Sequence, residues 1–75
     1  MRVYIVMEDN GETYEDYREY VRGAYSTREK AIKAIKNAGF EFAEGYRAWS
    51  RPRYYFDGTI ETYESAWIIE REVDA

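Results

Sequence analysis

Residues 26–39, with the sequence STREKAIKAIKNAG, carry the strongest secondary-structure signal in the chain and predict an amphipathic helix. Ser26 is the candidate N-cap, and Glu29, three residues later, completes a capping-box pattern. The apolar stripe of this helix is Ala31, Ile32, Ala34, Ile35 and Ala38. Gly39 is placed to end the helix in the left-handed conformation. Because the stripe is rich in alanine, we expect the helix to lie close against a sheet.

Short apolar and aromatic runs on both sides of the helix predict β-strands. The predicted strands are residues 3–7, 19–25, 46–56, 59–63 and 67–73. Pro52 should interrupt the third of them and lie at an edge, a bulge or a loop, because proline cannot donate a ladder hydrogen bond. Asn10-Gly11 and Asp57-Gly58 predict tight turns, and the second turn should pair residues 59–63 with the end of the preceding strand. Residues 12–17 and 40–45 are expected to form an irregular loop and a connector.

The order of these elements predicts a fold of the α+β class, in ββαβββ order, over a single small domain of residues 1–75. One helix should pack on a mainly antiparallel sheet of four to five strands. Residues 3–7 and 67–73 form the most apolar of the predicted strands. We therefore expect these two strands at or near the centre of the sheet.

Nine tyrosines and two tryptophans occur in a chain of 75 residues that has no cysteine and no histidine. The commonest general base, the commonest metal ligands and the strongest nucleophile are therefore absent. Without a histidine, no serine can belong to a conventional catalytic triad. The composition predicts a protein that is not an enzyme, that uses no cofactor or metal, and that acts by contact.

Charge is distributed unevenly along the chain. Residues 1–20 carry six acidic and two basic side chains, whereas residues 21–38 carry one acidic and five basic side chains. In the first segment, tyrosines alternate with acids, and the candidate partner-binding residues are Glu12, Tyr14, Glu15, Asp16 and Tyr17. Carboxylates there could occupy a basic groove of a partner protein. We expect both rings to be at least partly exposed; the alternative is that they close over the sheet as a lid.

Residues 46–55 suggest a second kind of site, because they combine three arginines with aromatic rings and contain no acid. Proteins bind single-stranded nucleic acids and nucleotides through arginines that contact the phosphates and aromatic rings that stack on the bases. The candidates for such a site are Arg47, Trp49, Arg51, Arg53 and Tyr54. Two alternatives remain open: the rings alternate into the core while the arginines stay in water, or the segment is a protein interface.

Three segments together, VYIV at 3–6, RGAYSTREKA at 22–31 and WIIEREVD at 67–74, resemble short uncharacterised β-β-α-β-β proteins of phages, prophages and bacterial genomes. The resemblance implies no functional residue, because its motifs are structural. It does imply a phage-borne anti-defence protein, similar in kind to anti-CRISPR proteins. Residues 46–63 depart from the shorter members of this group, and a specific function would lie there.

These observations favour a non-enzymatic protein of a phage or mobile element that binds and inhibits a host protein, such as a CRISPR-type effector. Binding of nucleic acid or a nucleotide through residues 46–55 is the alternative, and a homodimer formed by an exposed strand is a third interpretation. We expect the protein in the cytoplasm of a bacterial host. The lack of cysteine fits that compartment, residues 1–7 are too short for a signal peptide, and no apolar run could cross a bilayer.

Overall fold

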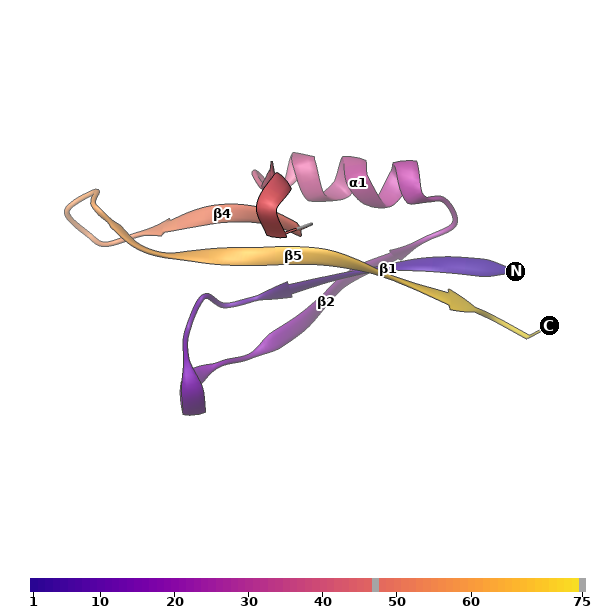
Figure 1. Cartoon of the computed structure of the whole chain (residues 1–75), viewed down its shortest axis with the longest axis horizontal. Helices are drawn as coiled ribbons and strands as arrows, with labels where there is room; N and C mark the ends of the chain where they lie inside the picture. Colours follow the sequence, from indigo (N-terminus) through magenta and orange to yellow (C-terminus); the bar gives the residue numbers. More distant parts are fainter. Residues whose placement is uncertain (47, 75) are drawn as a thin grey trace.

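The computed structural model describes residues 1–46 and 48–74, which form five strands and one α-helix. The strands are β1 (Arg2–Asp9), β2 (Glu19–Tyr25), β3 (Glu41–Ala43), β4 (Ala48–Tyr54) and β5 (Ile60–Glu72), and the helix is α1 (Arg28–Asn37). The strands form one sheet in the order β2-β1-β5-β4-β3, and each neighbouring pair is antiparallel. Helix α1 lies along one side of this twisted sheet (Figure 1).

The two most apolar strands lie where the sequence predicted them. β5 is the middle strand of the sheet and β1 is its neighbour. Their register pairs Val6 with Ile68 and Ile5 with Ile69, so apolar side chains lie side by side on both faces of the sheet. β5 pairs with β1 along one edge and with β4 along the other, which makes it the strand that connects the two halves of the sheet.

Helix α1 begins one residue later than the sequence suggested. The N-cap is Thr27, whose side chain accepts a hydrogen bond from the Lys30 amide at 3.2 Å. Ser26 is not the cap, and its hydroxyl instead accepts from the Lys30 ammonium group at 3.4 Å. Both residues are good capping types, so the sequence alone did not distinguish them. The predicted end is confirmed: Gly39 has a φ of 92° and its amide donates to the Lys36 carbonyl.

The core lies between α1 and the face of the sheet that α1 covers. Within the described part of the chain, the buried apolar residues are Val6, Ala31, Ile35, Phe40, Trp49 and Ala66. Two of these six side chains are alanines, so little apolar volume is buried. A core of this size gives a small domain only a modest free energy of unfolding.

Arg51 on β4 ties the end of the helix to the sheet. Its Nε and Nη2 atoms donate to Glu64 Oε1 on β5, at 3.1 and 2.9 Å, and Nη1 donates to the carbonyl of Ala38 at 2.7 Å. The guanidinium carbon also lies 4.4 Å from the centroid of the Phe40 ring. One side chain thus satisfies a carbonyl at the helix C-terminus, pairs a carboxylate and covers a core ring.

The predicted α+β class needs correction, because the chain is mostly antiparallel sheet with one short helix. α1 has ten residues, whereas β5 alone has thirteen. Residues 59–63 and 67–73, predicted as separate strands, belong to this one strand. The expected connector at 40–45 instead contains β3, whose Phe42 stacks edge-on against Trp49. In each case pairing with a neighbouring strand, which no local pattern encodes, extends the sheet.

Pro52 does not interrupt β4, and of the positions that the sequence predicted for it (an edge, a bulge or a loop) it occupies an edge. β3 pairs only with the first three residues of β4, and its first residue, Glu41, lies opposite Ser50. Pro52 pairs in register with Tyr63 of β5 on the other side. Its missing N–H is therefore tolerated, because β4 is an edge strand at that point.

We expect Arg51→Ala to lower the free energy of unfolding by about 2–3 kcal/mol, because it removes charged hydrogen bonds that are largely shielded from water. Arg51→Lys should restore less than half of this loss, since an ammonium group lacks the planar fork. The measurement is urea denaturation followed by circular dichroism. Arg28→Ala is the control, because its pair with Glu70 is exposed and 3.5 Å long. Equal stability of R51A and R28A would contradict the role assigned to Arg51.

The turn between β4 and β5 gives a pH-dependent prediction. The Thr59 hydroxyl and amide donate to Asp57 Oδ1 at 2.7 and 3.0 Å, and these bonds lower the pKa of the Asp57 carboxyl. Their stabilisation of the turn is present above the ordinary aspartate pKa and is lost as the pH falls through the lowered value. Thr59→Ala should raise the pKa of Asp57, and Thr59→Ser should keep it low. Carboxyl ¹³C titration measures this, and identical curves for the two variants would contradict it.

Candidate protein-binding surface

The β1–β2 loop, residues 10–18, holds the predicted partner-binding residues and is folded around the side chain of Asn10. Asn10 Oδ1 accepts hydrogen bonds from the amides of Glu12 and Arg18, at 3.1 and 3.2 Å. Asn10 Nδ2 donates to the carbonyl of Asp16 at 2.7 Å. Arg18 Nη1 donates to the carbonyls of Glu15 and Tyr17, at 2.7 and 2.8 Å. Side chains thus replace strand pairing as the partners of this backbone, and they give the loop a defined shape.

The β1–β2 loop is also attached to the neighbouring β4–β5 hairpin. Arg53 of β4 donates through Nη1 to the carbonyl of Asn10 at 2.6 Å and through Nη2 to Glu61 Oε1 at 2.7 Å. Nη2 also pairs with the Glu12 carboxylate. The hydrogen bonds to Glu61 and then Glu12 raise the pKa of Arg53, so it is charged at any physiological pH. The loop and the hairpin project from the same end of the molecule, away from the termini (Figure 1).

Tyr14 lies at the turn of the β1–β2 loop, in η1 (Tyr14–Asp16), and its ring is almost entirely in water. Its side chain is 94% exposed and its φ is 54°, a left-handed conformation that a bulky residue rarely adopts. Such a conformation costs about 1–3 kcal/mol and persists only where surrounding contacts impose it. The hydrogen bonds of Asn10 and Arg18 supply those contacts.

Tyr17 is 39% exposed, and its hydroxyl donates to Glu19 Oε1 at 3.1 Å. Partial burial, followed by the hydrogen bond and charge of Glu19, raises the pKa of the Tyr17 phenol, which stays protonated and remains a donor. The prediction that Tyr14 and Tyr17 are exposed is confirmed. Tyr14 does not close over the sheet as a lid, and whether the two rings bind a partner stays a prediction.

The three predicted acids differ in their surroundings. Glu12 pairs with Arg53 and so helps to fix the loop. Glu15 and Asp16 are exposed, and neither forms an ion pair with another described residue. The structure therefore brings one aromatic ring and two carboxylates together at the outer end of the loop, and it uses Glu12 as a support.

The candidate nucleic-acid residues do not form one surface. Trp49 is 6% exposed and belongs to the core, whereas Tyr54 is 58% exposed. Arg51 and Arg53 are engaged by Glu64, Glu12 and Glu61. Arg47 lies outside the described residues. A phosphate would have to displace carboxylates from both arginines, which argues against this alternative.

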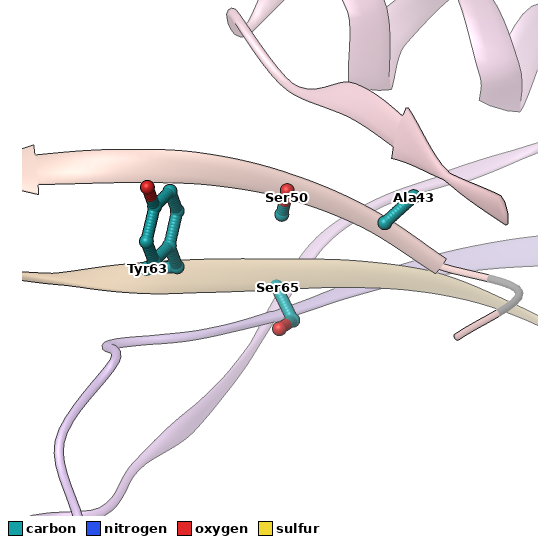
Figure 2. A pocket seen from close by; sticks show the side chains of 4 residues that line it. All are labelled: Ala43, Ser50, Tyr63 and Ser65. Carbon is teal, nitrogen blue, oxygen red and sulfur yellow. The ribbon is translucent and has the colours of Figure 1, made fainter. Parts of the chain in front are cut away.

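Sequence reasoning missed a second surface, the face of the sheet opposite α1. We call it the open face, and its central residues are Val3, Ile5, Met7, Trp67 and Ile69. The face also has a hollow of about 470 Å³, lined by Ala43, Ser50, Tyr63 and Ser65 from three strands (Figure 2). The signal was present in the sequence: in β1 the odd-numbered positions are as apolar as the even-numbered ones, so both faces are apolar.

Within residues 1–46 and 48–74, no cluster of acidic side chains has the arrangement needed to hold a metal ion. The helical segments of that same part of the chain are all too short or too polar to cross a membrane. The two surfaces described above, the β1–β2 loop and the open face, present tyrosine rings, carboxylates and apolar side chains.

The family model for a domain of unknown function, DUF7336, matches residues 1–74. The chain belongs to this family. Membership in DUF7336 confirms the coarser part of the resemblance, a family of small domains without an assigned function, and leaves phage origin as a proposal. No curated protein and no solved structure matches the chain.

Proposed function

We propose that this DUF7336 domain is a non-enzymatic protein that binds another protein through its β1–β2 loop and thereby occupies that protein's surface. The observation that carries the proposal is the Tyr14 ring, exposed on a strained backbone in a loop fixed by hydrogen bonds. Strain of this kind is concentrated at functional sites. Folding alone gives no reason to hold a tyrosine ring in water at an energetic cost.

A loop that is already ordered binds with a smaller loss of conformational entropy than a flexible one. Its tyrosine ring offers a large contact area with only two rotatable angles, and it can become the desolvated anchor of an interface. Glu15 and Asp16 directly follow Tyr14 in η1. Their carboxylates would steer a basic partner surface to the loop and would hydrogen-bond to arginine there.

We further propose that the partner is a host protein with a basic groove, such as a CRISPR-type defence effector. The resemblance to phage and prophage proteins and the acidic first segment support this choice of partner. In this proposal the protein is encoded by a phage or mobile element and acts as an inhibitor in the bacterial cytoplasm. Carboxylates on the loop would then take the place of nucleic-acid phosphates.

The test is the double substitution of Tyr14 and Tyr17 by serine in a pull-down from a bacterial lysate that contains CRISPR effectors. We expect capture of a stoichiometric protein partner to fall at least tenfold, since two anchoring rings are lost. The melting temperature should stay within about 3 °C, because surface substitutions change stability little. Calorimetry of the purified variant measures the melting temperature.

The matched control is Tyr54→Ser with Tyr55→Ser, which removes two exposed rings, 58% and 54% in water, from the β4–β5 hairpin. This control should retain the partner. Equal loss of capture in the two double variants would refute a specific role for the loop. A large fall in the melting temperature after the loop substitutions, with partner binding intact at low temperature, would also refute this role. The two rings would then stabilise the fold and would not bind the partner.

A further inference from the structure

The open face is an apolar surface in the middle of the sheet, on the side away from α1. Register places Ile5 beside Ile69 and Met7 beside Trp67 on β1 and β5. Successive side chains of a strand point to opposite faces, so these residues lie opposite Val6, which packs in the core. Of the elements in the described part of the chain, α1 is the one that packs against β1 and β2 from outside the sheet, and it covers the other face (Figure 1).

The fold buries little apolar surface without this face. In the part of the chain whose burial is described, the core that α1 and the sheet form contains six buried residues. The sequence has no cysteine, so no disulfide can add stability. Domains of this size commonly need a disulfide, a metal or association with another chain. Association is the one of these that the open face could provide.

We propose that two copies of this chain pack their open faces together and form a symmetrical two-sheet sandwich. At about 3.3 Å per residue and about 4.8 Å between strands, the open face of the whole five-stranded sheet covers roughly 600 Å² per copy and roughly 1,200 Å² per pair, whereas its five central residues are half-buried and make up a smaller part of it. A specific, stable interface buries about 1,200–2,000 Å² in total. A dimer that uses nearly the whole face therefore reaches the lower end of this range.

Charge favours a second copy as the occupant of this face. The chain carries a net charge of −4, so two copies repel each other over most of their surfaces. Between Val3 and Met7, and between Trp67 and Ile69, the open face has no charged side chain. The charges nearest to them on this face are Arg71, opposite Val3, and Asp9, which accepts a hydrogen bond from the Ser65 amide. These two charges have opposite signs and lie at opposite ends of the apolar residues, so two copies whose strands run in opposite directions can bring unlike charges together.

The edges of the sheet are less suited to pairing between copies. β2, at one edge, is interrupted where Arg22 is left out of the register with β1, so that Val6 and Met7 pair with Gly23 and Val21. β3, at the other edge, has three residues. Bulges and short strands are the devices by which sheet edges avoid pairing. The dimer we propose therefore differs from one made by an exposed strand.

The hollow on the open face is the part of this surface that offers the sharpest test. Its lining includes the small side chains of Ala43, Ser50 and Ser65, with Tyr63 as one wall (Figure 2). In the dimer, a large side chain of the second copy would fill this space. A charge placed there faces water in the monomer and becomes buried in the dimer.

The experiment is sedimentation velocity at about 1 µM and about 500 µM, a range that spans weak and tight dimers. The mass should rise from 9.0 kDa toward twice that value. Ile69→Lys and Ser65→Lys should each raise the dimer Kd at least tenfold, and Asn37→Lys, which adds the same charge at the exposed end of α1, should leave it unchanged. Circular dichroism shows whether each variant is folded. If Ile69→Lys does not fold, the dimer Kd of Ser65→Lys alone tests the interface.

A 9.0 kDa monomer at every concentration would overturn the proposal. A dimer that dissociates equally with Ser65→Lys and Asn37→Lys would also overturn it, because the interface would then lie elsewhere. The dimer is independent of the function proposed for the β1–β2 loop. Loop variants that lose the heterologous partner should still form it, so the two proposals fail separately.

Discussion

The sheet of this protein is much larger than the helix that covers it, and this mismatch determines which apolar side chains are buried. A helix of ten residues is about 15 Å long, whereas a strand of thirteen residues is about 43 Å long. α1 can therefore shield only the middle of one face, where Val6, Trp49 and Ala66 lie. The opposite face is equally apolar in its central strands and has no such layer in the described structure. Packing explains the first face, and association with a second chain offers an explanation for the other.

Two arginines of β4 attach the less regular parts of the chain to this sheet. Arg51 binds the end of α1, and Arg53, two residues further on, binds the β1–β2 loop. Each is also paired with a carboxylate of β5. The segment whose arginines and aromatic rings suggested nucleic-acid binding therefore has a structural use in its own chain. The loop gains a fixed shape from this arrangement, and that shape is what allows Tyr14 to stand in water.

The sequence predicted those features that local interactions determine. The helix over 26–39 and its end at Gly39 follow from periodicity and from the freedom of glycine, and the exposure of Tyr14 follows from its acidic neighbours. β3 and the continuous β5 were not predictable, because residues such as Glu64 and Ala66 have little intrinsic preference for strands and are extended by their neighbours. The open face was missed because the apolar run of β1 predicts a central strand but does not tell which of its two faces a helix covers. The same pattern arises when one face is covered by a helix and the other awaits a partner chain.

The two tryptophans report on the two faces separately, since Trp49 lies in the core and Trp67 on the open face. The most direct measurement is acrylamide quenching of Trp67 fluorescence in the folded Trp49→Phe variant, over a dilution series. Because Trp67 is partly exposed in a single chain, we expect it to be quenched more than Trp49 in dilute solution and to become increasingly protected as the concentration rises. In Trp67→Phe, the remaining Trp49 should be protected throughout. If Trp67 were as protected as Trp49 at every dilution, or were quenched equally at the lowest and the highest concentration, the open face would not be a surface that a second copy covers.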